Sequence, residues 1–126
     1  MQMDGVVVSG LGRGADYVGM DAYQHRFAET LGFEPFPGTL NLEVDAAAKQ
    51  RLQETATHHR IEAFSVDGED YSAVDAYPVT VDGATAALLE MEVTDHPASI
   101  AELISPVNLR EELGLEDGDR VTCRPR

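Results

Sequence analysis

Residues 73–93 read AVDAYPVTVDGATAALLEMEV and predict a β-hairpin of two long strands. Asp82-Gly83 lies between these strands, 73–81 and 84–93, and such a dipeptide is typical of a two-residue hairpin turn. Asp67-Gly68 marks a second turn, at the end of a β-rich run over 61–66. The middle of the chain therefore predicts antiparallel strands joined by tight turns.

Shorter elements are predicted on both sides of this hairpin. Strand-like runs occupy residues 5–9, 39–44, 100–104 and 120–124. Helical patterns occupy residues 20–31, 46–56 and 108–114. Asp21 with Gln24, and Asn108 with Glu111, have the spacing of a capping box. Six or seven short strands with two or three short helices favour a mainly β barrel over a layered α/β sheet, and we expect a single domain over 1–126.

The charge of the chain is strongly negative. Its 126 residues include 23 acidic and 9 basic ones, the formal net charge is −14, and Lys49 is the only lysine. A dispersed acidic surface suits molar salt, where the Debye length is about 3 Å and repulsion between carboxylates is weak. We therefore expect a halophilic protein, with an ordinary acidic protein as the alternative. The same charge disfavours nucleic acid as a partner.

The sequence also predicts a cytoplasmic protein with no membrane partner. No apolar run approaches the roughly 18 residues that a membrane-spanning helix needs, and the first residues lack the pattern of a signal peptide. Cys123 is the only cysteine, which excludes a disulfide framework. We expect it to pack in the core rather than to act as a nucleophile.

A glycine-rich loop is predicted after the first strand, with the residues Gly10, Leu11, Gly12, Arg13, Gly14 and Ala15. This loop formally matches the fingerprint of dinucleotide-binding folds. However, the helix after it leads to GFEPFP at 32–37, which is not a strand, so a dinucleotide-dependent oxidoreductase is disfavoured. Two interpretations stay open. The loop is either a plain turn or a phosphate cradle in which backbone N–H groups approach an anion and Arg13 adds charge.

The segment PGTLNL at 37–42 is the most specific in the chain. Along a strand, Thr39 and Asn41 point to one face, whereas Leu40 and Leu42 point to the other. A hydroxyl and an amide carbonyl oxygen can then meet one hard cation, and Mg²⁺ in nucleotide sites often takes few protein ligands. Read alone, the segment favours an ordinary amphipathic edge strand.

The pattern as a whole resembles the archaeal CTP-dependent riboflavin kinase family. The similarity spans nearly the whole chain, in order and at compatible spacing, although residues 45–98 match only loosely. The segments that carry it are SGLG at 9–12, LGFEP at 31–35, PGTLNL at 37–42, ELISP at 102–106, LR at 109–110, LGL at 113–115 and DGDRV at 117–121. The combination is specific, although no single segment would be.

This resemblance implies a six-stranded cradle-loop (riboflavin-kinase-like) β-barrel. It also implies transfer of the γ-phosphate of CTP to the 5′-hydroxyl of riboflavin, with Mg²⁺ as cofactor and FMN and CDP as products. We expect the chain to act as a monomer. The implied nucleotide contacts are residues 10–15 together with Val107, Asn108, Leu109 and Arg110, and the implied metal ligands are Thr39 and Asn41.

The implied flavin contacts are Thr94 and Glu102. Thr94 is identified only by its spacing from Glu102. From the sequence pattern alone, a single charge within the apolar run 100–104 indicates the solvent face of a strand. The resemblance instead places Glu102 at the site, either as a substrate-positioning contact or as the general base, and both roles stay open.

Two other function classes compete with a riboflavin kinase. The first is a barrel that binds a nucleotide or flavin without chemistry, or a regulator, since the C-terminal run also resembles that of swapped-hairpin transcription regulators. Such regulators need a basic DNA-binding face, which this acidic chain lacks. The second is the dinucleotide-dependent oxidoreductase, which is disfavoured by the topology.

The adjacent pair His58-His59 could suggest a metal site, but adjacent residues point apart, so we interpret the pair as a solvated helix end. His96 is interpreted as a loop residue.

Overall fold

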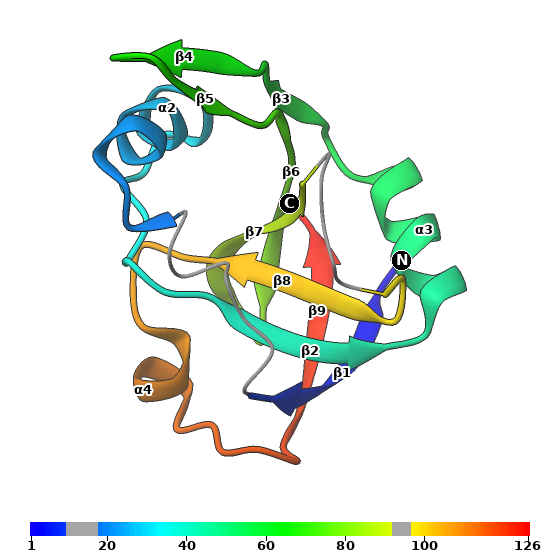
Figure 1. Ribbon diagram of the computed structural model, residues 1–126. Coiled ribbons are helices and arrows are strands. Elements are labelled where there is room, and N and C mark those ends of the chain that lie inside the picture. Colours follow the sequence, from blue (N-terminus) through cyan, green and yellow to red (C-terminus); the bar gives the residue numbers. More distant parts are fainter. Residues whose placement is uncertain (10–17, 92–96) are drawn as a thin grey trace.

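The computed structural model describes residues 1–9, 18–91 and 97–126, and its centre is a closed antiparallel barrel (Figure 1). The barrel strands follow one another in the order β6-β7-β8-β2-β1-β9, and β9 pairs back onto β6 to close the ring. Their bounds are β1 (Met3–Val8), β2 (Leu40–Val44), β6 (Val74–Val81), β7 (Ala84–Met91), β8 (Ile100–Ile104) and β9 (Arg120–Pro125). The expected mainly β, six-stranded barrel is therefore confirmed.

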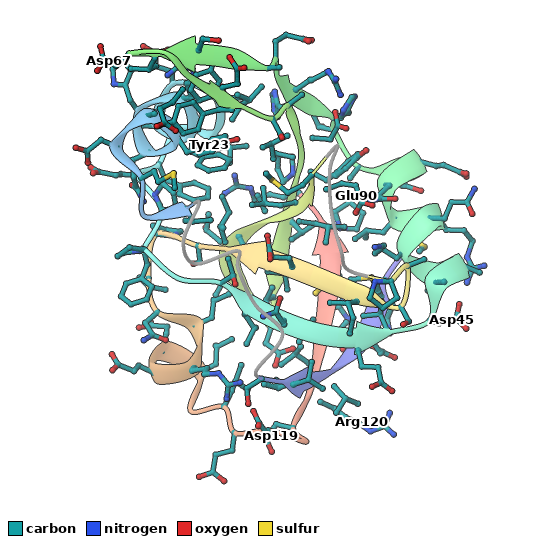
Figure 2. The ribbon with its side chains drawn as sticks, in the orientation of Figure 1. Tyr23, Asp45, Asp67, Glu90, Asp119 and Arg120 are labelled. Atoms are coloured by element: carbon teal, nitrogen blue, oxygen red, sulfur yellow. The ribbon has the colours of Figure 1, made fainter. Side chains whose placement is uncertain are left out.

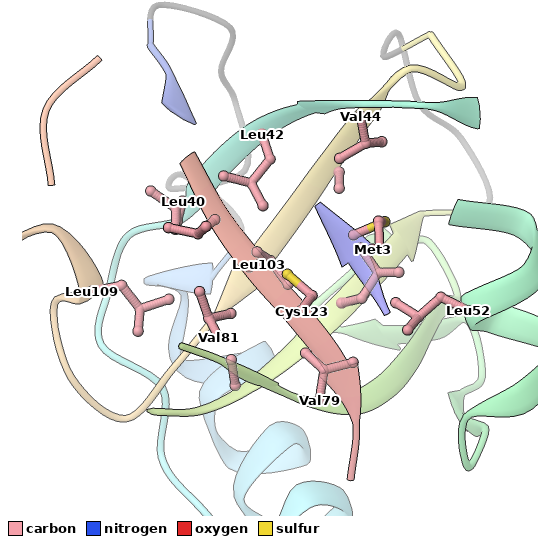
Figure 3. Close-up of a cluster of buried hydrophobic side chains, with 14 of the residues drawn as sticks. Met3, Leu40, Leu42, Val44, Leu52, Val79, Val81, Leu103, Leu109 and Cys123 are labelled. Carbon is pink, nitrogen blue, oxygen red and sulfur yellow. The ribbon is translucent and has the colours of Figure 1, made fainter. Parts of the chain in front are cut away.

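Alternating apolar side chains fill the barrel interior (Figure 3). Leu42, Leu88, Leu103 and Cys123 are completely buried there. Cys123 is packed as expected, and burial raises the pKa of its thiol to about 12. The interior is tightly packed where β1 pairs with β2, because a Cβ on Gly5 would lie 2.9 Å from the Cβ of Leu42.

A second apolar cluster lies outside the barrel, between it and the helix α2 (Asp21–Leu31). The hairpin of β4 (Phe64–Val66) and β5 (Glu69–Tyr71) covers this helix (Figure 1). Tyr23 makes edge-on contacts with the rings of Phe64 and Tyr71, at centroid distances of 5.2 and 5.6 Å (Figure 2). The Arg26 guanidinium carbon lies 3.6 Å from the centroid of the Phe64 ring. Edge-on aromatic contacts and the contact of Arg26 with the Phe64 ring therefore attach the hairpin to the helix.

Both predicted hairpin turns are confirmed. Asp67 and Gly68 have φ values of 52° and 82°, and Asp82 and Gly83 have φ values of 46° and 88°. Two successive residues with positive φ form the turn whose twist matches that of the flanking strands. The predicted strand over 61–66 is wrong in detail, because the chain forms β3 (His59–Ile61), which pairs with β6, and then β4, which pairs only with β5.

The helix ends test the predicted caps. Asp45 precedes the alanine-rich helix α3 (Ala46–Thr55) and caps it. Its side-chain carboxylate accepts a 3.0 Å hydrogen bond from the Ala48 N–H. Asn108 likewise caps α4 (Leu109–Leu113), which ends at Gly114. The capping box at Asp21 is wrong, since Met20 is the N-cap and makes no side-chain cap bond. Asp21 is instead the first helical residue, where a negative charge is favourable near the helix N-terminus.

His58 and His59 do not end a helix, because α3 stops at Thr55. The His58 ring stacks on Tyr77 at a centroid distance of 5.1 Å, and its Nε2 lies 2.7 Å from the Asp75 carboxylate. His59 begins β3. The predicted helix end is therefore wrong, and His58 belongs to the contact between β3 and β6. In the described part of the chain, no helix is long and apolar enough to cross a membrane.

Candidate functional site

Asn41 and Glu102 lie directly opposite each other in the β2–β8 ladder. The neighbouring residues Leu40, Leu42 and Leu103 point into the barrel core, so this polar pair points to the outer face of the barrel. Directly opposed residues of antiparallel strands place their Cβ atoms about 4.5–5.5 Å apart. Both residues are nevertheless buried, with 8% of Asn41 and 7% of Glu102 exposed. The prediction of a solvent-facing Glu102 is therefore wrong.

The amide oxygen of Asn41 is a buried acceptor. No described group donates a hydrogen bond to this Oδ1 atom. An unsatisfied buried acceptor costs about 1–3 kcal/mol, so such atoms call for an explanation. An amide oxygen is a hard ligand of the kind that Mg²⁺ prefers, and the residues present therefore fit the expected metal.

Thr39 lies immediately before β2 and lines a cavity of about 150 Å³. The cavity lies between the segment that leads into β2 and the segment that connects β8 to α4. Its lining residues are Phe36, Gly38, Thr39, Leu40, Leu103, Ser105, Val107, Asn108, Leu109 and Arg110. The structure thus brings Thr39 together with all four of the nucleotide contacts expected at 107–110. Asn41 and Glu102 do not line this cavity but lie one pair further along the β2–β8 ladder.

Backbone and hydroxyl hydrogen bonds fix the two walls of this cavity. The Phe36 N–H donates to the Ser105 carbonyl oxygen at 2.8 Å, which joins one wall to the other. The Ser105 hydroxyl is buried and donates to the Thr85 carbonyl oxygen at 2.7 Å. The same oxygen accepts from the Val107 N–H at 3.3 Å. Ser105 therefore sets the path of the chain through the predicted nucleotide contacts.

Arg110 connects α4 to the end of β1. Its guanidinium donates to the Asp117 carboxylate at 2.7 Å and to the Val8 carbonyl oxygen at 3.3 Å. The Ser9 hydroxyl donates to the other Asp117 carboxylate oxygen. The Ser9 hydrogen bond, and then that of Arg110, lower the pKa of Asp117. The charge of Arg110 is thus partly neutralised by Asp117, although the Arg110 side chain remains 35% exposed beside the cavity.

Several predicted site residues lie outside the described residues. They are Gly10, Leu11, Gly12, Arg13, Gly14, Ala15 and Thr94, together with His96, which was interpreted as a loop residue. Among the described residues, no three His, Cys, Asp or Glu side chains gather closely enough to hold a metal ion. The expected metal ligands Thr39 and Asn41 offer neutral oxygen atoms.

Five lining residues of the cavity were not predicted as site residues from the sequence: Phe36, Gly38, Leu40, Leu103 and Ser105. Ser105 could have been noticed as a polar residue that follows an apolar strand and precedes Pro106. Phe36 gives no such signal, because a single aromatic residue between Pro35 and Pro37 is compatible with any loop.

A family model named CTP-dep_RFKase, and described as domain of unknown function DUF120, matches residues 7–124. Curated relatives that carry the name riboflavin kinase are also similar over nearly the whole chain. The relative from Ignicoccus hospitalis is 42% identical, over 96% of this chain and 69% of its own length. The relative from Thermococcus kodakarensis is 46% identical, over 93% of this chain and 55% of its own length. The relative from Methanosarcina acetivorans is 38% identical, over 98% of this chain and 53% of its own length.

The chain spans about half the length of several of these curated relatives. In this chain, the residues matched by the family model, 7–124, include the β2–β8 polar pair and the cavity beside α4. A full-length family model match, together with relatives above 30% identity, shows the descent of the chain. The chain therefore belongs to the CTP-dependent riboflavin kinase family.

Proposed function

We propose that this chain transfers the γ-phosphate of CTP to the 5′-hydroxyl of riboflavin, giving FMN and CDP. The names of the curated relatives support riboflavin as the acceptor, and the name of the family supports CTP as the donor. The observation that carries the proposal is the buried Asn41–Glu102 pair, one step along the ladder from a cavity lined by Thr39 and residues 107–110. Such an arrangement suits a nucleotide on one side and an alcohol acceptor on the other.

Thr39 and Asn41 are the residues that would hold Mg²⁺. Both offer neutral oxygen atoms, which suffice because a triphosphate supplies the negative charge. When bound, the ion would offset charge that develops on the transferred phosphoryl group. The burial of the Asn41 amide oxygen keeps this ligand in a fixed position, so little reorganisation is needed for it to bind a cation.

Glu102 is the proposed contact with the reacting end of riboflavin. During transfer, a bond forms between the 5′-oxygen and the γ-phosphorus, and the bond from that phosphorus to the bridging oxygen of CDP breaks. The proton of the hydroxyl must leave, and a carboxylate that accepts its hydrogen bond can orient the oxygen and take the proton. Phosphoryl transfer depends mainly on placing the two oxygens in line, so positioning alone already gives Glu102 a role.

Residues 107–110 are proposed to bind the nucleotide, together with 10–15, and Thr94 is proposed as a second flavin contact. Backbone groups near 107–110 can read the amine and the two acceptors of cytosine. A polar group left unpaired by another base costs about 1–3 kcal/mol. CTP is therefore expected to be the better donor by roughly 5- to 150-fold in kcat/KM for each unmet group.

The test is incubation with riboflavin, Mg²⁺ and one nucleoside triphosphate at a time, at high KCl, followed by chromatography for FMN. FMN should form fastest with CTP. Equal or faster formation with ATP would contradict the donor assignment but leave a riboflavin kinase. Tight binding of CDP and riboflavin without FMN under any condition would instead favour a non-catalytic binding barrel.

A further inference from the structure

Phe36 is an exposed aromatic residue at the boundary between two cavities. It lines the cavity of about 150 Å³ that contains Thr39, and also a neighbouring cavity of about 440 Å³ that contains Gln24 and Glu34. The residue is 39% exposed, and Val107, which lines the smaller cavity with it, is 38% exposed. Single exposed apolar residues are ordinary on protein surfaces. Two exposed apolar side chains in one cavity that is also lined by polar residues indicate an apolar contact for a bound molecule.

Both residues are held in place before any ligand arrives. The Phe36 N–H is bonded to the Ser105 carbonyl oxygen, and the Val107 N–H is bonded to the Ser105 hydroxyl. The Phe36 carbonyl oxygen accepts a 2.7 Å hydrogen bond from the Gly38 N–H, which closes a tight turn just before Thr39. A ligand that binds here therefore pays little for ordering the backbone of either wall, and such preorganisation favours affinity.

Gly38 gives the Phe36 ring its room. A Cβ at Gly38 would lie 3.0 Å from Cε1 and 3.4 Å from Cδ1 of that ring. The 3.0 Å distance is tighter than ordinary van der Waals contact, so a side chain at residue 38 would require the ring to shift by a few tenths of an ångström. The glycine therefore allows the ring to lie against the turn.

We propose that Phe36 binds the cytosine ring of CTP by stacking, with Val107 as a second apolar contact. This inference rests on the proposed function. Stacking on an aromatic side chain is available to any base, and hydrogen bonds from residues 107–110 would add the choice of cytosine. Phe36 thereby supplies affinity for the ring, while the backbone on the other wall supplies specificity.

Two observations favour the base over the isoalloxazine ring of riboflavin. First, Thr39 lines the same cavity, so a nucleotide whose phosphates reach a cation at Thr39 has its base within reach of Phe36. The acceptor hydroxyl is instead expected at Glu102, which does not line this cavity. Second, the cavity that holds Phe36 and Thr39 together has a volume of about 150 Å³, below the roughly 300–1,000 Å³ of sites for larger ligands, and it suits one small ring. The neighbouring cavity of about 440 Å³ is lined neither by Thr39 nor by residues 107–110.

The chain contains no tryptophan, which gives a direct test. The Phe36→Trp variant carries a single tryptophan at the proposed contact, which can be excited selectively over the four tyrosines, and CDP should quench its emission with saturation. The matched control is Val66→Trp, because Val66 is similarly exposed, at 37%, but lies in β4 on the hairpin over α2. CDP should leave the control unchanged. Equal quenching of Phe36→Trp by inorganic pyrophosphate would overturn base stacking, because pyrophosphate has no ring.

Calorimetry of CDP and riboflavin binding completes the test. Phe36→Ala should weaken CDP binding by about 5- to 150-fold, the range found for loss of one base–aromatic stack, while riboflavin binding stays unchanged. Phe36→Tyr should retain CDP affinity, and Gly38→Ala should weaken it because the ring is displaced. A loss of riboflavin affinity with CDP affinity intact would assign the ring to the flavin and overturn the proposal.

The stacking proposal and the proposed function can fail separately. If the wild-type chain makes FMN from CTP but Phe36→Ala binds CDP normally, only the stacking contact is wrong. If the wild-type chain neither binds CDP nor makes FMN, both proposals are wrong. Unchanged melting temperatures of the Phe36 and Gly38 variants would show that any loss of affinity is local, as the exposure of Phe36 leads us to expect.

Discussion

Asn41 and Glu102 are polar residues that the barrel buries without placing them in its core. Among the described residues, the buried polar or charged ones are Asn41, Lys49, Glu102 and Ser105. Lys49 and Ser105 have hydrogen-bond partners that account for their burial. The Asn41 amide oxygen has no hydrogen-bond donor among the described groups. A buried acceptor without a donor is compatible with the proposed role of Asn41 as a metal ligand.

The first prediction at this scale concerns the metal ligands. Thr39→Val and Asn41→Leu should each lower kcat by at least about 100-fold at saturating Mg²⁺, because charge on the transferred group is no longer offset. The free energy of unfolding of Asn41→Leu should stay the same or rise, since an unsatisfied buried acceptor is removed. Steady-state kinetics and urea unfolding measure the two effects.

Glu43→Leu is the matched control for Asn41→Leu, because Glu43 is an exposed residue on the same strand and the same face. It should keep normal turnover. Near-normal turnover of both metal-ligand variants would show that the segment is only a structural strand of the barrel, paired on both sides.

The second prediction separates the two roles of Glu102. Glu102→Gln keeps the shape of the side chain but loses its basicity. If Glu102 is the general base, kcat should fall by roughly 10²–10⁴-fold while riboflavin binding is nearly intact. If Glu102 only positions the substrate, KM for riboflavin should rise and kcat should largely survive. Glu112→Gln, at an exposed position in α4, is the control. Wild-type values for Glu102→Gln would remove it from the site.

At the scale of elements, α3 is attached to the barrel by the only lysine of the chain. Lys49 is 6% exposed, and its Nζ donates to the Ile100 carbonyl oxygen at 3.0 Å. The same atom lies 3.4 Å from the Glu90 carboxylate, so the helix is tied to both β7 and β8. Figure 1 shows α3 at the side of the barrel where β8 begins. A compact ammonium group suits this narrow position better than the planar fork of an arginine.

Lys49→Met is therefore expected to destabilise the fold by about 1–3 kcal/mol, because the Ile100 carbonyl oxygen loses its charged donor. Urea unfolding of the purified chain measures this change. Gln50→Met, at an exposed position of the same helix, should change the unfolding free energy by less than about 0.5 kcal/mol. Equal stability of Lys49→Met and wild type would show that packing alone holds α3.

At the scale of the whole molecule, the acidic surface is the dominant feature. Among the acidic residues that the structure describes, only Glu102 is buried, so the others place their charges toward solvent. A net charge of −14 on one small chain produces self-repulsion at low ionic strength. Screening by molar salt should remove most of that repulsion.

The melting temperature is therefore expected to rise between low and molar KCl, and circular dichroism during heating measures it. The same series in a salt-free osmolyte such as sucrose controls for general effects on burial. A melting temperature that stays constant or falls as KCl increases would remove the halophilic interpretation and leave an ordinary acidic protein.

The amino-acid sequence by itself determined the local features of this protein. Asp82-Gly83 and Asp67-Gly68 form the expected turns, because positive φ at two successive residues favours these residue types. Asp45 and Asn108 cap their helices because a short acceptor reaches the N–H group three residues later. The family resemblance, confirmed by the family model, also identified the barrel, whereas the site residues that it implies stay predictions.

Only the tertiary structure decided which distant residues meet. Asn41 lies opposite Glu102 because β2 pairs with β8 in one register, and a shift of β2 by one residue would turn Asn41 into the core. Phe36 and Val107 line one cavity because the backbone N–H of each is hydrogen-bonded to Ser105, and no local pattern encodes this arrangement. The run over 61–66 likewise divides because β3 is held by β6 while β4 follows the aromatic rings on α2. Register, closure and burial depend on interactions between segments far apart in the chain, so short-range preferences alone do not fix them.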